Sequence, residues 1–224
     1  MISVVIPTLN AAETLADTLE SLVGPHGLVD EIVVSDGGSG DGTRALATRR
    51  GARLVEGEQG RGRQLARGAE AATRPWLLFL HADTRLEPGW DGTVRAFLDR
   101  PDAEERAATF AFKLDDEAWA ARALERLVAA RVRAFALPYG DQGLLLSRRL
   151  YDQVGGFRPL PLMEDVDLVR RIGRRRLAPL AARAVTSAAR YRRDGYVRRP
   201  LRNAACLLLH FAGAPPQIIA KLYG

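Results

Sequence analysis

Residues 31–50, EIVVSDGGSGDGTRALATRR, join an apolar run to a segment with helical spacing through a glycine-rich turn. Residues 32–34 are apolar and β-branched, which favours a strand, and Thr43 begins a run with the periodicity of a helix. The turn over 35–43 contains four glycines, so its backbone can approach a ligand closely. This stretch predicts a buried strand, a turn beside a ligand site and a helix in direct succession.

The same succession occurs on both sides of this stretch. Strands are predicted at 3–7 (SVVIP), 52–56 (ARLVE) and 75–83 (PWLLFLHAD), with helices at 10–23 and 60–73. Strands that alternate with helices predict a parallel sheet with crossover helices. Because the apolar runs are continuous, we expect helices on both faces of the sheet. The predicted fold class is α/β.

The pattern changes in the second half of the chain. We predict helices at 89–100, 116–137, 149–157 and 163–175, and strands at 108–114 and 143–149. From about residue 184 onward the chain is basic and then apolar. We therefore expect one domain over 1–183 and a helical extension over 184–224 that packs on the same domain.

Composition limits the class of protein. The chain has 224 residues, of which 47% are apolar, enough for one sizeable core. Its only cysteine, Cys206, excludes an internal disulfide and a zinc site made of cysteine clusters. There is no signal-peptide pattern, and the apolar run 204–216 is shorter than the roughly 20 residues of a membrane-spanning helix. We expect a cytoplasmic protein.

The charge balance points to an anionic partner. The net charge is +6, and lysine occurs only at 113 and 221. Such a chain suits nucleotide phosphates or an acidic lipid surface, although many arginines can also reflect genomic base composition. Aromatic residues make up 7% and are not interleaved with basic runs, as a stacking surface for nucleic acid requires. We expect no nucleic-acid partner; peripheral contact at the inner membrane face and the oligomeric state stay open.

Polar residues follow the end of each of the first four predicted strands. The four segments are PTLN (7–10), SDGGSGDGT (35–43), GEQGRGR (57–63) and HADT (81–84). In open α/β sheets, ligands bind beyond the carboxyl ends of the strands. We therefore expect these four segments to border one crevice.

The glycine-rich turn has no lysine and matches neither the dinucleotide fingerprint nor a phosphate loop. Asp36 would repel phosphate, so it suits a base or ribose better. Asp41 is predicted as the N-cap of the second helix, and Asn10 as a candidate N-cap of the first. Arg61 and Arg63 stand near a helix start, where an anion can bind.

The segment HADT contains a candidate metal ligand. Asp83 offers the hard oxygen that Mg²⁺ or Mn²⁺ prefers, and His81 lies two residues away on the same side of an extended chain. Mn²⁺ accepts imidazole more readily than Mg²⁺ does, so the pair leans toward manganese. The alternative is a carboxylate that merely caps the turn after a strand.

Two charged segments in the second half allow both a functional and a structural interpretation. Glu164, Asp165 and Asp167 fall in one helical turn, where acids complement the helix dipole, but where a carboxylate facing a crevice can also act as general base. The arginine-rich segment 190–199 lies beside the apolar run 204–211. It can neutralise a diphosphate, contact anionic lipid or form a solvated loop.

Together, these segments resemble the family 2 glycosyltransferases of GT-A fold. The resemblance rests on VVIPTLNAAETL, EIVVSDGGSGDGT, LLFLHAD, GGF and MEDVDLVRR, in this order over residues 2 to about 173. The segments HADT, GDQG, PLMEDVDL and VTSAARYRRDG are most similar to a small bacterial subgroup. That subgroup is associated by name with radical-SAM/selenium-domain proteins and arsenosugar biosynthesis.

The resemblance implies an inverting transfer of a sugar from a UDP- or GDP-linked donor to a hydroxyl or phosphate acceptor, which could be lipid-linked. It implies residue roles as follows: Pro7, Thr8, Asn10, Glu13, Asp36, Arg61 and Arg63 bind the nucleotide, Asp83 with His81 binds Mn²⁺ or Mg²⁺, Asp165 is the general base with Glu164 beside it at the acceptor mouth, and Asp141 with Gln142 lines the sugar pocket. A cation and arginines at the diphosphate would stabilise the leaving group.

The sequence departs from the family pattern at three places. The usual pair of aspartates after the second strand is Ser35 and Asp36, the first aspartate of the usual Asp-Xaa-Asp is His81, and an expected asparagine is Ala66 or Arg67. The second departure predicts a weaker metal requirement. Two alternatives stay open: a sugar nucleotidyltransferase, which would need a Gly-rich basic loop after the first strand, and a catalytically silent nucleotide-binding or membrane-surface module.

Overall fold

The computed structural model describes residues 1–24 and 27–223, and its strands form an eight-stranded sheet in the order β3-β2-β1-β4-β7-β6-β8-β5. The strands are β1 (Ile2–Thr8), β2 (Val29–Asp36), β3 (Arg53–Glu56), β4 (Trp76–Phe79), β5 (Thr84–Leu86), β6 (Ala107–Leu114), β7 (Leu144–Ser147) and β8 (Leu177–Thr186). The sheet is mixed. β1 to β4 pair in parallel, as do β6 and β8, whereas β7 and β5 pair antiparallel to their neighbours.

The predicted parallel half of the sheet is confirmed. β1 pairs in parallel with β2 and with β4, so that Thr8 lies opposite Asp36 and Val5 lies opposite Phe79. The carboxyl ends of these strands therefore meet at one edge. β4 ends at Phe79, earlier than the predicted residue 83, so His81 lies in the turn that follows the strand.

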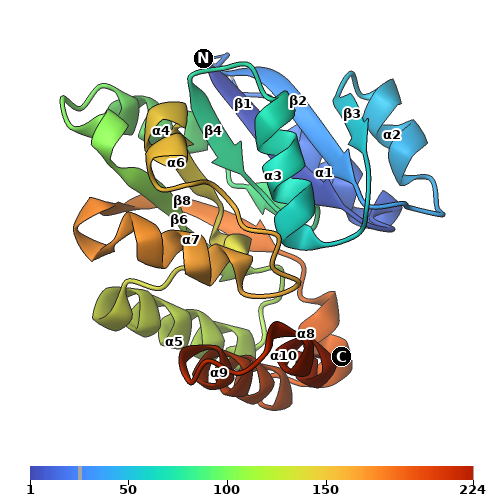
Figure 1. The fold of residues 1–224 in the computed structure, drawn as a ribbon, viewed down its shortest axis with the longest axis vertical. Helices are drawn as coiled ribbons and strands as arrows, with labels where there is room; N and C mark the ends of the chain where they lie inside the picture. The colour runs from blue at the N-terminus through green and yellow to red at the C-terminus, as the bar shows by residue number, and fades with distance from the viewer. Residues whose placement is uncertain (25–26, 224) are drawn as a thin grey trace.

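Helices cover both faces of the sheet, as predicted. They are α1 (Ala12–Ser21), α2 (Thr43–Arg49), α3 (Arg61–Ala71), α4 (Trp90–Leu98), α5 (Trp119–Phe135), α6 (Arg148–Gln153), α7 (Glu164–Ile172), α8 (Ala189–Asp194), α9 (Arg198–Phe211) and α10 (Pro216–Tyr223). Residues of α1, α2 and α4 pack in one core cluster, and residues of α3, α6 and α7 pack in another on the opposite face. In Figure 1 the second group lies in front of the sheet.

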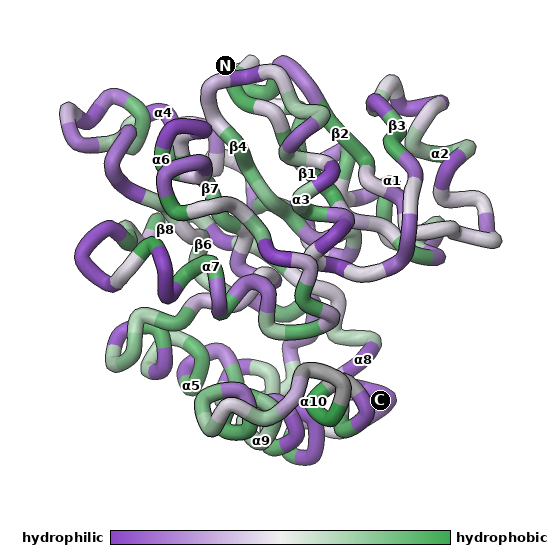
Figure 2. The backbone as a smooth tube through the Cα atoms, in the orientation of Figure 1, coloured by the Kyte–Doolittle hydropathy of each residue, from purple (hydrophilic) through white to green (hydrophobic). Residues whose placement is uncertain are grey.

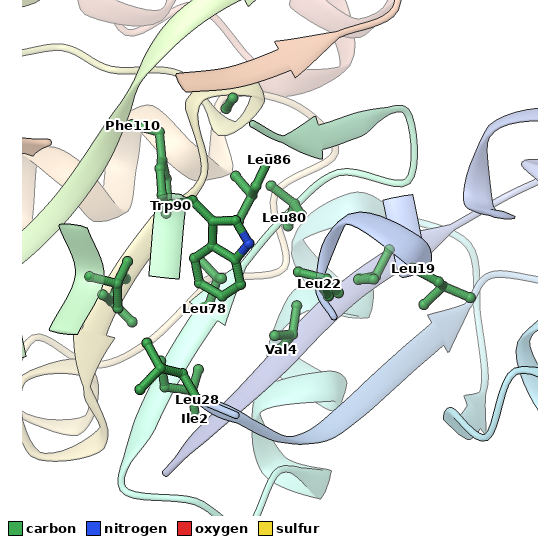
Figure 3. Close-up of a cluster of buried hydrophobic side chains, with 14 of the residues drawn as sticks. Ile2, Val4, Leu19, Leu22, Leu28, Leu78, Leu80, Leu86, Trp90 and Phe110 are labelled. Atoms are coloured by element: carbon green, nitrogen blue, oxygen red, sulfur yellow. The ribbon is translucent and has the colours of Figure 1, made fainter. Parts of the chain in front are cut away.

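The core explains why the strands are apolar along their whole length. Along β1, Val4 and Ile6 point into the cluster of α1 and α4, whereas Val5 points into the cluster of α3 and α7. Figure 2 shows a hydrophobic run along β4, near the centre of the sheet. Trp90 completes the first cluster (Figure 3), and its indole N–H donates to the Ser21 carbonyl at 3.0 Å. Because both faces are buried, the central part of β1 is apolar, and the buried polar residues Ser3 and Thr8 stand near its two ends.

The C-terminal part contains a strand that periodicity did not predict. β8 lies between β6 and β5 and runs through residue 183, where the basic extension was predicted to begin. Beyond β8, helices α9 and α10 pack against the start of α7 through Cys206, Ile219 and Val166. Within the described residues, no helix is both long enough and apolar enough to cross a bilayer.

Both predicted N-caps are wrong. α1 has Ala11 at its N-cap position and α2 has Gly42. The Asn10 side chain instead accepts the N–H of Gly40 at 2.9 Å, and Asn10 adopts a φ of 50°. The Asp41 carboxylate accepts the N–H of Thr43 at 2.9 Å and that of Ala12 at 3.1 Å. These two side chains therefore connect the loops after β1 and β2 to each other.

Candidate functional site

The loop after β2 is built around Asp36, which is fully buried. Its carboxylate accepts the Thr8 hydroxyl at 2.8 Å and the backbone N–H groups of Gly38 and Ser39 at 2.9 and 2.7 Å. Burial raises the pKa of this carboxyl, but the hydrogen bonds from Ser39, Thr8 and Gly38 outweigh burial, so its pKa lies below the ordinary value. Asp36 was predicted to face a nucleotide base. In the structure its buried carboxylate instead holds the loop after β2 through hydrogen bonds to Thr8, Gly38 and Ser39.

A groove runs along the carboxyl ends of the strands, and we call it the strand-end groove. Its lining includes Pro7, Thr8, Asn10, Glu13, Gln59, Gly60, Arg61, Gln64, His81, Asp83, Ser187 and Arg190. Four of the residues predicted to border a nucleoside, those at 7, 8, 10 and 13, are thus brought together along one wall.

Gln64 is a site residue that the sequence analysis missed. Its side-chain amide donates to the carbonyls of Thr8 at 2.7 Å and Ser35 at 3.0 Å, and so holds the ends of β1 and β2 at a fixed separation. Nearby, Arg67 donates to the Asp36 carbonyl at 2.9 Å. The sequence feature that could have indicated Gln64 is its position, one turn after Gly60 on the buried face of α3, where a polar side chain needs hydrogen-bond partners.

Arg61 and Glu164 join the first residues of two helices. Arg61 begins α3, Glu164 begins α7, and the Arg61 Nε donates to a Glu164 carboxylate oxygen. Glu164 is fully buried and does not line the groove, and its predicted place beside an acceptor stays a prediction. Burial raises its pKa and the Arg61 guanidinium opposes that rise. Arg63, in contrast, points outward to Glu58 and away from the groove.

A second cavity, which we call the deep cavity, continues from the strand-end groove. Its lining includes Arg61, His81, Asp83, Tyr139, Gly140, Asp141, Asp165, Ser187, Arg190, Arg199, Asn203 and Tyr223. Arg61, His81, Asp83 and Arg190 border both spaces. A ligand that fills the groove can therefore extend past these four side chains to Asp165.

Gly140 holds the two acid–base candidates of the deep cavity in place. Its N–H donates to Asp165 Oδ2 at 2.6 Å, and Asp165 Oδ1 accepts the N–H of Val166 at 2.7 Å. A Cβ atom on Gly140 would lie 2.5 Å from His81 Nε2, so the imidazole packs directly on this glycine. Burial and the nearby Arg61 lower the pKa of His81 to about 4, which makes the imidazole neutral at neutral pH.

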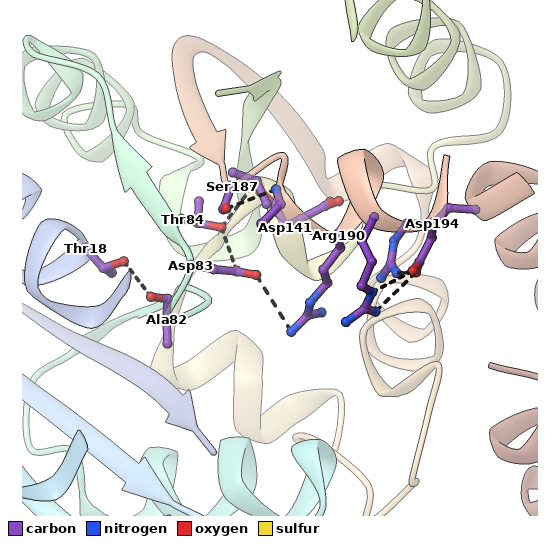
Figure 4. A network of polar contacts seen from close by, with 12 residues as sticks. Thr18, Ala82, Asp83, Thr84, Asp141, Ser187, Arg190 and Asp194 are labelled. Atoms are coloured by element: carbon purple, nitrogen blue, oxygen red, sulfur yellow. Dashed lines mark hydrogen bonds and ion pairs between the residues drawn. The ribbon is translucent and has the colours of Figure 1, made fainter. Parts of the chain in front are cut away.

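The carboxylate of Asp83 lies at the junction of groove and cavity. Arg190 Nη2 approaches its Oδ2 at 3.9 Å, and Figure 4 shows the two side chains pointing toward each other. The Ser187 N–H donates to the Asp83 carbonyl at 2.9 Å. The side chains of Thr84 and Thr186 hydrogen-bond at 2.9 Å across β5 and β8. Residues beyond 184 thus fix the turn that carries Asp83.

Asp141 and Gln142 have different surroundings. Asp141 lines the deep cavity, and its buried Oδ1 has no hydrogen-bond partner among the described residues. Burial, with the negative charges of Asp165 and Asp83, raises the pKa of Asp141 to about 6. Gln142 is buried outside the cavity, where its amide donates to the Phe110 carbonyl at 3.1 Å. Gln142 thus does not line the deep cavity, and its role at a sugar pocket stays a prediction.

The residues at the junction suit a divalent cation shared with a ligand. The neutral imidazole of His81 and the carboxylate of Asp83 are both at the junction. Among residues 1–24 and 27–223, no group of three or more His, Cys, Asp or Glu side chains is arranged to hold a metal ion. Phosphate oxygens and water would supply the other ligands, an arrangement that Mg²⁺ in particular favours.

Comparisons with known proteins identify the family. The family described as "Glycosyl transferase family 2" matches residues 3–162. A PGL/p-HBAD biosynthesis glycosyltransferase of Mycobacterium bovis (strain BCG / Pasteur 1173P2) is 40% identical over 93 residues, covering 38% of this chain and 36% of that protein. A glucosyl-3-phosphoglycerate synthase of Mycobacterium tuberculosis (strain CDC 1551 / Oshkosh) is 38% identical over 93 residues, covering 37% and 28%. The matches thus span about a third of these relatives.

Solved structures confirm the GT-A fold. The Mycobacterium tuberculosis glucosyl-3-phosphoglycerate synthase in complex with Mn²⁺, UDP and glucosyl-3-phosphoglycerate superposes with a TM-score of 0.63 at 23% identity, covering 96% of this chain and 81% of that one. The S. aureus TarS 1–349 complex with UDP-GlcNAc gives a TM-score of 0.63 at 19% identity, covering 83% and 58%. The mostly parallel sheet flanked by helices is therefore that of a GT-A glycosyltransferase.

Proposed function

The chain belongs to glycosyltransferase family 2, and on this premise we propose that it transfers a sugar from a UDP- or GDP-linked donor to a hydroxyl or phosphate acceptor, with inversion at the anomeric carbon. One observation carries the proposal: the strand-end groove and the deep cavity share Arg61, His81, Asp83 and Arg190. A donor lying along both would put its nucleoside in the groove, its diphosphate at the junction and its sugar before Asp165.

Positive groups at the junction suit the diphosphate. Arg61 stands at the start of α3, where the helix dipole also favours an anion, and Arg190 faces it across the junction. Pro7, Thr8, Asn10 and Glu13 are the nucleoside contacts in this proposal, and Asp36 acts through the loop. The pair His81 and Asp83 would hold Mn²⁺ or Mg²⁺ together with the diphosphate. The metal would supply positive charge opposite the leaving group.

Asp165 is the proposed general base. The N–H groups of Gly140 and Val166 orient its two oxygens, which leaves the carboxylate facing the deep cavity. It would accept the proton of the acceptor hydroxyl as the acceptor oxygen bonds to the anomeric carbon and the bond to the diphosphate breaks. Asp141 could bind sugar hydroxyls through its unpartnered oxygen. Glu164 would contribute only by orienting Arg61.

Nucleotide binding and base catalysis can be tested separately. We expect UDP or GDP to raise the thermal midpoint, more with Mn²⁺ than with EDTA, because a ligand at 100 times its Kd stabilises a protein by about 2.7 kcal/mol. Asp165→Asn should keep this shift and lose at least about a hundredfold in donor turnover, a typical lower figure for general-base loss. Full turnover by Asp165→Asn would refute the base assignment.

The two alternatives give different results in the same assays. A nucleotidyltransferase would release pyrophosphate from a nucleoside triphosphate, whereas the proposed reaction releases a nucleoside diphosphate. A silent binding module would show the thermal shift without turnover. The match to family 2 over residues 3–162 favours the transferase. The likeness to the arsenosugar-associated subgroup and the lipid-linked acceptor stay predictions about the substrate.

A further inference from the structure

One face of α9 is apolar and exposed. Leu201 and Leu208 are 65% and 68% exposed, and Val197, just before the helix, and Phe211 also lie at the surface. Successive members are four, seven and three residues apart, so at about 100° per residue they fall within one narrow arc of the helix. We call these four residues the α9 stripe.

The α9 stripe is not the face that holds the helix to the protein. Cys206 and Arg199, on the other side of α9, are buried, and Cys206 packs in one cluster with Ile219 of α10 and Val166 of α7. The helix thus has one apolar face for the core and a second one that faces outward. Exposed apolar surface of this kind marks an interaction site more often than a packing defect.

The neighbouring helix α10 extends the exposed apolar surface. Ile218 and Leu222, four residues apart, are both exposed and stand on the helix that packs against α9. Figure 1 shows α9 and α10 at the end of the molecule opposite the N-terminus, and Figure 2 shows hydrophobic and hydrophilic residues alternating along α9. The surface is therefore at a free end, where a large flat partner can reach it.

The segment that carries this surface has charged residues of one sign only. Residues 195–224 contain no aspartate or glutamate, whereas Arg198 and Lys221 are exposed there. The Arg170 guanidinium lies 4.9 Å from the Phe211 ring and adds a positive charge at the end of the stripe. Asp194, just before this segment, is already bound by Arg199 and Arg202. The partner should therefore be both apolar and anionic.

We propose that the α9 stripe docks the protein on an anionic lipid bilayer, with α9 lying in the plane of the interface. An in-plane helix needs apolar side chains on one face and cationic side chains beside them, and stable attachment needs both signals together. Anionic headgroups also attract each nearby arginine and lysine. A second copy of the chain fits less well, because it would bring two positively charged surfaces together.

If the proposed function holds, docking in this orientation would place the deep cavity at a fixed position relative to the bilayer. Arg199 and Asn203 of α9 and Tyr223 of α10 line the deep cavity. Because Arg199 and Asn203 lie on the face of α9 away from the stripe, the cavity with Asp165 would stand one helix diameter, ~10 Å, from the lipid surface, which suits an acceptor whose anionic or hydroxyl-bearing head projects from the interface. Binding to the bilayer itself does not depend on transfer, so the two proposals can fail separately.

Vesicle flotation tests the docking. The full chain should float with vesicles of phosphatidylcholine and phosphatidylglycerol, stay unbound with phosphatidylcholine alone, and detach at high salt. Leu201→Asp/Leu208→Asp should reduce the bound fraction by about tenfold or more, since two apolar anchors are lost and two negative charges are gained. Val23→Asp is the control, because Val23 is an apolar residue that is even more exposed, at 84%, but lies just after α1 and not in the α9 stripe.

Each outcome decides the proposal. Flotation that is lost in the double variant and kept in Val23→Asp supports it, provided that the thermal midpoint of the ligand-free double variant stays close to that of the parent protein. No flotation of the parent protein at low salt, or equal flotation of the double variant, would overturn it. A concentration-dependent dimer that the double variant abolishes, without vesicle binding, would assign the stripe to self-association instead.

Discussion

Gly140 provides a test of the deep cavity at the scale of one residue. An added Cβ would lie 2.5 Å from His81 Nε2 and 3.4 Å from Asp165 Oδ2, so Gly140→Ala must displace the imidazole. The backbone of Gly140 does not need a positive φ, so the fold should tolerate the change. We expect about a tenfold to hundredfold loss of kcat/KM, because misplacement by about 1 Å can cost that much.

The control for this change is Gly40→Ala. Gly40 also lacks a positive φ, and a Cβ there would meet nothing within 4 Å. Steady-state kinetics and thermal midpoints of both variants should be measured together. Equal activity of the two variants would mean that the packing of His81 on Gly140 has no part in the reaction.

The buried pair of Arg61 and Glu164 allows a double-mutant cycle. Removing one partner of a buried ion pair leaves an uncompensated charge and typically costs about 3–5 kcal/mol. Arg61→Gln, which leaves the fully buried Glu164 without its partner, should therefore lower the free energy of unfolding by about 3 kcal/mol. Glu164→Gln should cost less, because the remaining Arg61 side chain is 28% exposed and can be hydrated. The double variant should be less destabilised than the sum of the two, as urea unfolding can measure. Additive losses would show that the pair is not coupled.

At this scale the sequence predicted which residues gather, but not which of them face the ligand. His81, Asp83 and Asp165 converge because strand ends and helix starts meet at one edge of the sheet. Asp36 and Glu164 lie beneath that surface, and the missed Gln64 lines the strand-end groove. Their orientation depends on loop geometry, such as the positive φ of Gly38 and Met163, which residue types alone do not encode.

At the scale of elements, α10 can be tested as part of the folded core. Ile219 is 2% exposed and packs against Cys206, so Ile219→Ala should reduce the free energy of unfolding by about 2 kcal/mol or more. Its neighbour Ile218 is 54% exposed, so Ile218→Ala should have little effect. Urea unfolding of the two variants measures the difference. Equal stabilities would mean that α10 is not held in the packed position.

The elements that periodicity missed are β5 and β8. β8 reads LAPLAARAVT, which has few β-branched residues and a proline, so its pattern does not indicate a strand. It becomes a strand because β6 and β5 pair with it on both sides. β1 and β4 were predicted because burial on both faces makes their sequences almost continuously apolar. β2 and the edge strand β3 were predicted from shorter apolar runs, 32–34 and 54–55.

At the scale of the whole molecule, the site needs both ends of the chain. The strand-end groove is built by the region that matches the family, whereas Ser187, Arg190 and Tyr223 come from the part beyond residue 162. The division into residues 1–183 and 184–224 stays a proposal. The two parts would act as one unit, because β8 pairs with β5 and the Ser187 N–H donates to the Asp83 carbonyl. The free energy of unfolding of the whole protein should therefore depend on the protonation of His81 and Asp141 in the deep cavity.

Stability as a function of pH reports on both groups. The folded-state pKa of His81 is about 4, below its ordinary 6.5, so between these values the unfolded chain binds the proton and stability rises with pH. The folded-state pKa of Asp141 is about 6, above its ordinary 3.8, so over that range the folded chain binds the proton and stability falls with pH. Each contribution is at most about 3 kcal/mol, and the two oppose each other in the parent protein.

Single substitutions should therefore reveal opposite slopes in metal-free buffer. Asp141→Asn removes the falling contribution, so its free energy of unfolding should rise from pH 4 to 6.5 more steeply than that of the parent protein. His81→Gln removes the rising contribution, so its stability should fall over pH 4 to 6 relative to the parent protein. Urea titrations at half-unit intervals of pH measure both slopes. Parallel pH profiles for the two variants would contradict the assigned environments. Burial disfavours the charged form of both groups, so it raises the pKa of the Asp141 carboxyl and lowers the pKa of the His81 imidazole. Removing one group or the other must therefore change the slope of stability against pH in opposite directions.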